Sequence, residues 1–282
     1  MEGKNRHKYH DIKHIVIMCL WVLVILACVA LVVRRCACRR AKAATVVTVE
    51  HKPLYAGWLK VTLPQDIDNT TITYSAFTVH FNPTEHIANC VAYELSGEHT
   101  TGTVGRYKRF ECDFDVKGCA LPEYYSRSGY DRGHLAPAGD FKWDATAMRQ
   151  TFLMTNVCPQ NHSLNEGMWH KLEKKVREWA VRDSLLIVVA GPVPETHYEH
   201  TERGEVAIPQ RFFKVVSAPK ACPARTIAFV FNNEPCRGSL KEYAVSVDSL
   251  EKITGFDFHA GLPADMQAAM ESECDYSIWL TN

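Results

Sequence analysis

The chain has 282 residues, 46% of them hydrophobic, with 32 Lys and Arg balanced by 32 Asp and Glu. This composition excludes a disordered or collagen-like chain, and the length is ample for a large buried core. A net charge of zero argues against a nucleic-acid partner only if the charges are evenly spread. Residues 1–42 carry nine basic and two acidic side chains, a net of +7, which leaves −7 on residues 43–282. The asymmetry indicates a basic flank beside a separate globular body.

A long apolar stretch lies inside this basic flank. Residues 15–33 read IVIMCLWVLVILACVALVV, 19 residues without a charged side chain. As an α-helix this stretch would be about 28 Å long, close to the hydrocarbon thickness of a bilayer. A cleaved signal peptide is the alternative, but its apolar core is usually only about 7–15 residues long. We therefore expect a basic flank over residues 1–14, a transmembrane anchor over residues 15–33 and a basic tether over residues 34–52.

The cysteines and the charges around the anchor bear on its surroundings. Four Lys or Arg precede the apolar stretch and five follow it, so the positive-inside rule hardly distinguishes the two orientations of the anchor. No C-x-x-C pair occurs among the 11 cysteines, which leaves a zinc ribbon or a thioredoxin-like site without support. The spacings of Cys112 with Cys119 and of Cys222 with Cys236 suit loop-closing disulfides, which are typical of an oxidising compartment. These features favour an extracytoplasmic body.

Beyond the tether, apolar patterns predict strands and two helices. Strand-like stretches occupy residues 71–81, 89–95, 185–190, 210–217, 226–232 and 242–247, and Pro or Gly turn signals separate them. Residues 164–182 place Met168, Leu172, Val176 and Trp179 on one apolar stripe, which predicts an amphipathic helix. Residues 263–272 predict a second, shorter helix. Strands on either side of a helix, without regular alternation, predict an α+β domain with a mainly antiparallel central sheet flanked by helices.

Polar residues that could take part in catalysis lie between the first predicted strands and the long helix. Residues 125–140 read YSRSGYDRGHLAPAGD, and TNVCPQN follows at residues 155–161. A neutral imidazole takes a proton from water near physiological pH, so His134 is a candidate general base. Amide and carboxylate oxygens suit a hard cation such as Mg²⁺, and arginine is the natural donor to the extra charge of a pentavalent phosphate. These residue types suit metal-assisted phosphodiester hydrolysis.

The geometry of the predicted long helix permits a shared metal site. Asn165 lies in its first turn, and Glu173 lies two turns on and about 80° round the axis. Side chains lean toward the helix N-terminus, so the two residues can share one metal ion and its water shell. Arg177, one turn further, reaches the same edge of the cleft. The alternative for Asn165 is a simple helix cap, since asparagine is favoured there.

The motif Asp131-Arg132-Gly133-His134, with T-N-x-x-P-Q, L-N-x-G-x-W and L-E following in that order, resembles the DNA/RNA non-specific endonuclease family. Members of this family are the endonuclease G-like, ββα-metal nucleases. The resemblance covers roughly residues 53–260, and it implies a ββα-metal active-site motif within a domain over residues 53–282. It further implies DNA and RNA substrates, 5′-phosphate products, a single Mg²⁺ with Mn²⁺ as a substitute, and a homodimer as one possible assembly.

Carried over position by position, the resemblance implies a role for each residue of the motifs. His134 would be the general base, and Asn165 would be the one direct protein ligand of Mg²⁺. Glu173 would contact the ion through water, and Asn156 would position His134 or the substrate. The substrate phosphates would be bound by Asp131, Arg127, Arg132 and Arg177, of which Arg132 and Arg177 would also support catalysis.

Together these features predict a membrane-anchored, Mg²⁺-dependent endonuclease without sequence preference. The alternative is a non-catalytic nucleic-acid-binding or uptake module on the same scaffold, which the intact His134, Asn165 and Glu173 disfavour. An acidic body needs a local positive rim to bind nucleic acid, and candidates for it are Arg127, Arg132, Lys142, Arg149 and Arg177. The expected location is a bacterial envelope, with residues 15–33 in the lipid bilayer. A mitochondrial membrane is the alternative by family analogy.

Overall fold

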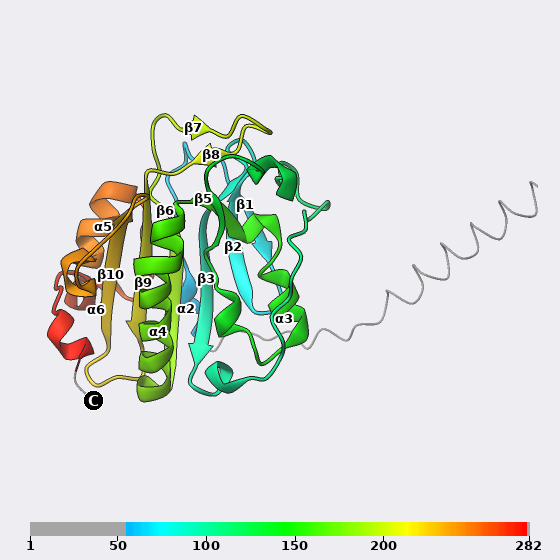
Figure 1. The fold of residues 1–282 in the computed structure, drawn as a ribbon. Helices are drawn as coiled ribbons and strands as arrows, with labels where there is room; N and C mark the ends of the chain where they lie inside the picture. Colours follow the sequence, from blue (N-terminus) through cyan, green and yellow to red (C-terminus); the bar gives the residue numbers. More distant parts are fainter. Residues whose placement is uncertain (1–54, 281–282) are drawn as a thin grey trace, which may run out of the picture. The chain divides into compact units, whose positions relative to one another are not determined.

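The computed structural model describes residues 55–280, in which a central sheet has helices on both faces (Figure 1). Its seven strands follow the order β1-β2-β3-β6-β9-β10-β11, and every neighbouring pair is antiparallel. The strands are β1 (Thr70–Thr73), β2 (Phe77–Asn82), β3 (Ile87–Ser96), β6 (Leu185–Pro192), β9 (Arg211–Ala218), β10 (Arg225–Asn232) and β11 (Ala244–Val245). The predicted α+β class with a mainly antiparallel sheet is confirmed.

Two small hairpins stand apart from the central sheet. In the first, β4 (Asp131–His134) pairs with β5 (Val157–Gln160), and in the second, β7 (Glu199–His200) pairs with β8 (Ala207–Ile208). The first hairpin contains the D-R-G-H motif and is followed along the chain by the long helix α4 (His170–Asp183). This order of two strands and a helix is the arrangement that the sequence motifs imply.

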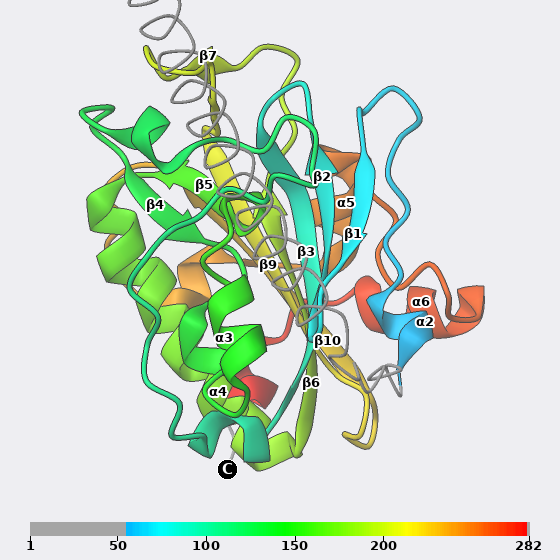
Figure 2. The ribbon, with the colours of Figure 1, turned by 90° about the vertical axis from the view of Figure 1, so that its right-hand side faces the viewer.

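The helices divide between the two faces of the sheet (Figure 2). On one face lie α4 and α3 (Ala145–Gln150), and on the other lie α2 (Ala56–Leu59), α5 (Val247–Thr254) and α6 (Ala264–Glu271). The predicted apolar stripe of α4 is buried against the sheet, as the amphipathic pattern requires.

Strand β9 shows why the central strands are apolar almost throughout. Side chains alternate between faces, so Phe212 and Val216 pack in the core under α4, while Phe213 and Val215 pack in the core under α5. Each fully buried side chain of this size contributes roughly 1.5–3 kcal/mol of apolar burial. Two residues break the apolar pattern, Lys214 on the α4 face and Ser217 on the α5 face, and both are fully buried.

Two of the predicted strands differ from the structure. The stretch 71–81 is a hairpin rather than one strand, because the chain turns at residues 74–76, where the Tyr74 N–H donates to the Phe77 carbonyl at 2.9 Å. In the stretch 242–247 only β11 is extended. Polar caps account for this second difference: Ser239 and Glu242 form a capping box before β11, and Ser246 caps α5 immediately after it.

The predicted long helix is also interrupted near its start. Residues Leu164–Trp169 form a π-type turn with a kink at Gly167 (φ −99°, ψ −109°), and the regular helix α4 begins at His170. Asn165 therefore precedes the regular helix instead of lying in its first turn. The prediction of its angular position from uniform helical steps is wrong, because Gly167 changes the direction of the backbone between Asn165 and Glu173.

The seven cysteines of the described residues are all free thiols, so both predicted disulfides are wrong. Cys222 lies in the turn between β9 and β10, and Cys236 follows the far end of β10. A strand of this length separates them by about 25 Å, far beyond disulfide reach. Cys112 and Cys119 do lie close together, but the Cys112 thiol donates to the Cys119 carbonyl at 3.3 Å.

The predicted transmembrane anchor over residues 15–33, the flank before it and the tether to residue 52 lie outside the described residues. No helix within residues 55–280 combines the length and the apolar character needed to span a bilayer.

Candidate active site

The D-R-G-H motif forms strand β4, whose register pairs Asp131 with Gln160 and His134 with Val157. Alternation along a strand places Arg132 and His134 on one face. The ring of Phe110 confirms this, because it lies 5.2 Å from the His134 ring and 5.5 Å from the Arg132 guanidinium carbon. Position 133 must be glycine, because a Cβ there would lie 2.4 Å from the Gln160 side chain.

His134 is a buried, neutral imidazole. Only 9% of the residue is exposed, and the rings of Phe110 and Phe152 pack against it, the latter at 4.8 Å. The pKa of His134 is lowered to about 4, chiefly by burial and also by the charge of Arg106, while the charge of Glu173 opposes the shift. Its Nε2 atom is buried without a hydrogen-bond partner in the protein. The side chain is thus uncharged at neutral pH and has a free nitrogen, as a general base requires.

Asn156 holds the backbone that follows His134. It is fully buried, and its Oδ1 accepts from the Ala136 N–H at 2.9 Å. Its Nδ2 donates to the carbonyls of Ala136 at 2.9 Å and Thr151 at 2.8 Å. The Trp169 indole N–H donates to the His134 carbonyl at 3.2 Å. Of the two predicted uses of Asn156, this geometry favours positioning His134, because backbone groups take up the whole amide.

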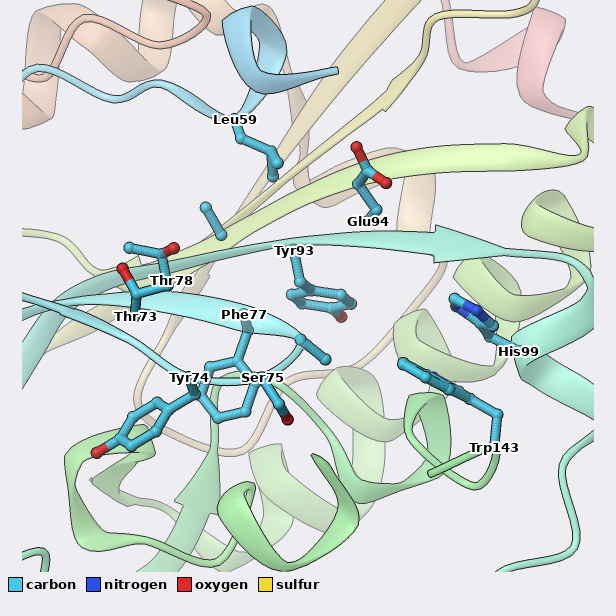
Figure 3. Close-up of a pocket in the computed structure, with 12 residues that line it drawn as sticks. Leu59, Thr73, Tyr74, Ser75, Phe77, Thr78, Tyr93, Glu94, His99 and Trp143 are labelled. Atoms are coloured by element: carbon cyan, nitrogen blue, oxygen red, sulfur yellow. The ribbon is translucent and has the colours of Figure 1, made fainter. Parts of the chain in front are cut away.

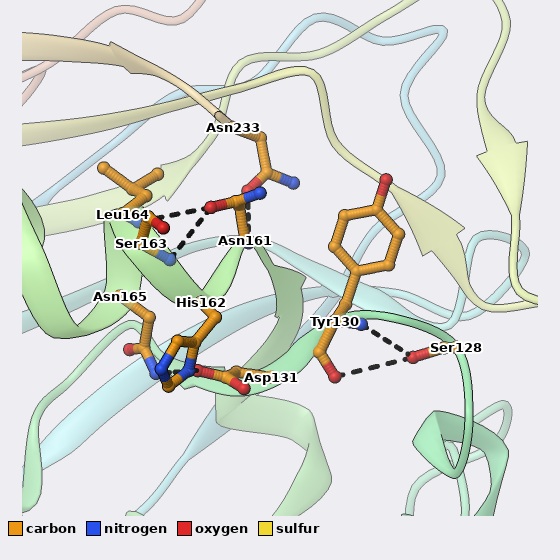
Figure 4. A network of polar contacts seen from close by, with 9 residues as sticks. All are labelled: Ser128, Tyr130, Asp131, Asn161, His162, Ser163, Leu164, Asn165 and Asn233. Atoms are coloured by element: carbon orange, nitrogen blue, oxygen red, sulfur yellow. Dashed lines mark hydrogen bonds and ion pairs between the residues drawn. The ribbon is translucent and has the colours of Figure 1, made fainter. Parts of the chain in front are cut away.

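Asn165 is oriented by Asp131 (Figure 4). Its Nδ2 donates to Asp131 Oδ2 at 2.9 Å, and the same oxygen lies 2.9 Å from His162 Nδ1. The Asn165 backbone N–H donates to the Asn161 carbonyl at 2.9 Å. These contacts leave Asn165 Oδ1 without a hydrogen-bond partner among the described residues. Asp131 thus contacts Asn165, as is typical of a residue that orients a metal ligand, and its predicted substrate contact stays a prediction.

Glu173 lies in a buried cluster of charges beneath the hairpin. Its side chain is 11% exposed and lies 3.5 Å from His170 Nδ1. Burial would raise the pKa of the Glu173 carboxyl, but the contact with His170 and the charges of Lys214 and Arg177 lower it overall. Lys214, on β9, is 1% exposed, and its ammonium lies 4.3 Å from the Trp169 ring centroid. Glu173 is therefore held ionised by cations that the fold places around it.

Arg177 is already paired. Its Nη1 lies 2.8 Å from Asp140 Oδ1, and the Tyr93 hydroxyl donates to the other Asp140 oxygen at 2.8 Å. Burial raises the pKa of Asp140, and Arg177 opposes that shift. A Cβ at Gly139 would lie 2.9 Å from the Arg177 guanidinium, so this side chain packs closely against the backbone there. Arg177 thus stabilises a buried acid as well as the charge of Glu173.

Of the other predicted rim cations, two are bonded to groups of the protein and two are exposed. Arg132 donates from Nε and Nη2 to the Pro122 carbonyl at 3.2 and 2.7 Å. Arg149 forms an ion pair with Glu111 at 2.9 Å. Arg127 and Lys142 are exposed. The structure therefore does not bring the five rim candidates together as one free positive surface.

The donor set near the hairpin fits a hard divalent cation. Asn165 Oδ1 and the Glu173 carboxylate offer oxygen atoms of the kind that such a cation prefers, and Asp131 holds the Asn165 amide in place. Within the described residues, Asp248, Glu251 and Glu271 also lie within 4.8 Å of one another, but they belong to the opposite face of the sheet. Glu271 is buried and the other two are partly buried, and the cluster contains none of the predicted ligands.

Three residues near the site were not predicted from the sequence. Gln160 is 1% exposed, and neither atom of its amide has a hydrogen-bond partner. Its place in the T-N-x-x-P-Q motif was an available signal. Lys214 is a lone charge within the apolar run FFKVV, which was a second signal. For the third residue, Arg106, no sequence pattern indicated proximity to His134.

The pocket in Figure 3 is separate from these residues. It has a cavity volume of about 70 Å³ and lies over β2 and β3 with Glu94, His99 and Trp143 among its lining residues. None of the predicted catalytic residues lines it. Tyr93 links it to the site, because its ring lines the pocket and its hydroxyl bonds Asp140.

Comparisons with known proteins identify the family. Residues 55–265 match the family model described as DNA/RNA non-specific endonuclease. A nuclease of Nostoc sp. is 32% identical over 221 residues, covering 74% of this chain and 80% of that protein. A nuclease of Serratia marcescens is 31% identical over 228 residues, with coverages of 73% and 80%.

Two further similarities are to a longer protein and to a solved structure. The mitochondrial nuclease EXOG of Xenopus laevis is 32% identical over 220 residues, covering 72% of this chain but 61% of that protein. A solved structure of the EndoG/EndoGI complex matches with a TM-score of 0.66 at 24% identity, covering 70% of this chain and 89% of that chain. This last similarity concerns the fold.

Proposed function

The chain belongs to the DNA/RNA non-specific endonuclease family and is a nuclease, and from this premise we propose a Mg²⁺-dependent endonuclease without sequence preference. It would cleave both DNA and RNA and leave 5′-phosphate ends. The observation that carries the proposal is His134, a neutral imidazole with an unpartnered Nε2 beside an oriented Asn165. The second candidate, a nucleic-acid-binding module without catalysis, has no comparable observation in its favour.

The chain's own residues divide the work of the reaction. His134 accepts the proton of the attacking water, while Asn156 and Trp169 hold its backbone and Phe110 and Phe152 keep its ring dry. A neutral ring at the start of the reaction is essential, because a protonated one has no lone pair to offer.

Two residues would hold the metal ion, with Asn165 as the direct ligand and Glu173 in contact through water. When bound there, Mg²⁺, or Mn²⁺ in its place, would stabilise the negative charge that develops on the phosphate and on the 3′-oxygen leaving group. Asp131 keeps the Asn165 oxygen free for this purpose, and Lys214 with Arg177 keeps Glu173 ionised.

The decisive test is digestion of plasmid DNA and of RNA by the full-length protein, with Mg²⁺ and with EDTA. We expect both substrates to be degraded with Mg²⁺ alone, His134→Ala to be inactive, and His197→Ala, which removes an exposed loop histidine, to behave as wild type. Equal cutting by wild type and His134→Ala, or cutting in EDTA, would overturn the mechanism. Binding of DNA without any cutting would favour the non-catalytic module.

The membrane anchor is a separate part of the proposal and rests on the sequence alone. Residues 15–33 would insert in a lipid bilayer, with residues 34–52 as a basic tether to the nuclease domain. The expected location is a bacterial envelope. Relatives described as mitochondrial nucleases support the alternative, a mitochondrial membrane. Protease digestion of intact and of opened cells or mitochondria would decide the compartment and the side, and light scattering of the purified protein would test for a homodimer.

A further inference from the structure

Residues 161–165, which we call the ligand turn, carry Asn165 without the support of a regular helix. The turn begins where the chain leaves β5, the kink at Gly167 follows it, and α4 begins only at His170. Asp131 orients the Asn165 side chain, but a side chain is placed only as well as the backbone that carries it. The contacts that fix the backbone of this turn therefore affect the proposed metal ligand.

Asn161 organises the ligand turn from its first residue (Figure 4). Its backbone carbonyl accepts the Asn165 N–H at 2.9 Å. Its Oδ1 accepts the Ser163 N–H at 2.9 Å and the Leu164 N–H at 3.4 Å. An asparagine side chain that bonds the backbone two residues further on is a common way to start a turn. The position of Asn165 thus depends on where Asn161 is held.

Asn233, which follows β10, holds Asn161 from a distant part of the chain. Its Oδ1 accepts the Asn161 N–H at 2.7 Å, although 72 residues separate the two in the sequence. Its Nδ2 donates to the Pro159 carbonyl at 3.1 Å and to the Pro209 carbonyl at 2.7 Å. Its backbone N–H donates to the Gln210 carbonyl at 2.7 Å. One amide thus joins the end of β5, the stretch before β9 and the end of β10.

The Asn233 amide also covers the outer edge of β5. In the part of the chain that the structure describes, the sheet of β5 contains only β4 and β5, so its outer edge has no neighbouring strand. A free edge leaves backbone N–H and C=O groups without partners. The Asn233 amide donates to Pro159 and accepts from Asn161 two residues later, so it takes the place of a peptide group of a further strand. Loss of this amide would release the chain at the start of the ligand turn.

We propose that Asn233 is a positioning residue for the metal ligand Asn165 and that it acts through Asn161. This inference rests on the proposed function and assigns a role to a residue outside the sequence motifs. Asp131 holds the Asn165 side chain, whereas Asn233 and Asn161 hold its backbone, so two separate contacts place the Asn165 oxygen. Mg²⁺ tolerates little distortion of its octahedral shell, so a displaced ligand costs affinity.

Calorimetric titration of the full-length protein with Mg²⁺ tests the proposal without turnover. We expect Asn233→Ala to weaken Mg²⁺ binding about 10–100-fold, as for other residues that support a metal ligand. Asn232→Ala removes the adjacent, exposed asparagine side chain and should behave as wild type. Asn89→Ala removes a buried amide on β3 that donates to the Asp68 carbonyl at 3.0 Å. It should lower the Tm by several degrees, as Asn233→Ala should, but keep the wild-type Mg²⁺ affinity.

Hydrogen exchange measures the ligand turn in the absence of metal. In EDTA, the backbone amides of Asn161 and Asn165 should exchange about tenfold faster in Asn233→Ala than in wild type, and those of β9 should keep wild-type rates. Asn233→Asp keeps the shape and the acceptor but turns a carboxylate toward the carbonyls of Pro159 and Pro209. It should also weaken Mg²⁺ binding, and it carries the test if Asn233→Ala does not fold.

Activity at rising Mg²⁺ separates metal placement from chemistry. Asn233→Ala should need about 10–100-fold more Mg²⁺ for half-maximal cutting of plasmid DNA, yet approach the wild-type kcat once the metal saturates. Wild-type Mg²⁺ affinity in the Asn233 variants would overturn the positioning role, and so would an equal loss of affinity in Asn89→Ala. A wild type that neither binds Mg²⁺ nor cuts would instead overturn the proposed function, whatever the exchange rates of the variants.

Discussion

Two buried histidines on opposite faces of the sheet show how a structural polar group differs from a functional one. His259 is fully buried on the α5 face, and both ring nitrogens are bonded, Nε2 to Ser217 Oγ at 2.7 Å and Nδ1 to Glu271 Oε1 at 2.6 Å. His134 is almost as buried, but its Nε2 has no partner. Buried polar atoms in proteins are normally satisfied, and His134 Nε2 is one of several exceptions among the described residues. Its place in the D-R-G-H motif is what points to a reaction that completes its bonding.

The hydrogen-bonded cluster around His259 also shows that residue types alone do not make an active site. Ser217, His259 and Glu271 form the chain of contacts that a hydrolase triad uses, yet Ser217 has no exposed surface on which a substrate can approach. Such a network fixes the segment after α5 and the helix α6 to the sheet. In contrast, the cluster around Glu173 includes the residue that we propose to contact a metal ion through water.

Exchanging the histidines for asparagine would test this contrast most directly. His134→Asn should lower kcat by about 10²–10⁴-fold, because the general base is lost, with little change in stability. His259→Asn should lower the free energy of unfolding by about 1–3 kcal/mol and leave the kcat of the folded protein near wild type. Plasmid digestion and urea unfolding measure the two effects. The comparison fails if both variants lose activity equally or both lose stability equally.

Replacing Lys214 tests how far the ionised state of Glu173 depends on the cations around it. Lys214→Met leaves the Glu173 and Asp140 side chains with fewer compensating cations, so we expect a loss of about 2–4 kcal/mol of stability. Mg²⁺ affinity should fall about 10–100-fold, as for other residues that support a metal ligand. Urea unfolding and calorimetric Mg²⁺ titration measure these. In the double variant Lys214→Met, Glu173→Gln, stability should recover in part, and full additivity would show that the two residues are not coupled.

The lowered pKa of His134 predicts how stability and activity change as the pH falls. In the unfolded chain this histidine titrates near 6.5, and in the folded protein near 4, so the unfolded state binds the proton first as the pH falls. Its contribution to stability is complete above pH 6.5 and decreases toward pH 4, by about 3 kcal/mol in all. Activity should persist to about pH 5 and fall through pH 4. Unfolding of His134→Asn across this range should lack the decrease, and an unchanged pH dependence would contradict the assignment.

The smallest effect is expected on the other face, at Glu251. Burial, together with the nearby acids Glu271, Asp257 and Asp248, raises the pKa of Glu251 from 4.5 to about 7. The folded state therefore holds the proton longer than the unfolded state, and stability should fall as the pH rises from 4.5 to 7. Glu251→Gln keeps an acceptor for the Phe258 N–H, which now bonds at 2.8 Å, and should remove this fall. Chemical unfolding at pH 5 and pH 8 compares the two proteins.

Local patterns in the sequence determined much of the fold and the identity of the candidate site. Apolar runs located β3, β6, β9 and β10 to within about two residues, because buried strands carry their signal in consecutive side chains. The D-R-G-H motif and its followers identified His134, Asn165 and Glu173, because these residues lie in short segments of fixed spacing. The kink at Gly167 escaped the pattern, since a helical stripe tolerates a glycine without showing which φ and ψ it adopts.

The tertiary structure decided what each charged residue is free to do. Asp140 lies 37 residues from Arg177 in the chain, and Glu111 lies 38 from Arg149, so no local pattern reveals that these arginines are already paired. The same packing leaves Arg106 unpaired and brings it next to His134 across Phe152. The sequence by itself determined which residues have the chemistry for phosphodiester cleavage. Only the folded chain decided which of their charges remain available, because long-range pairing depends on how the loops pack against the sheet.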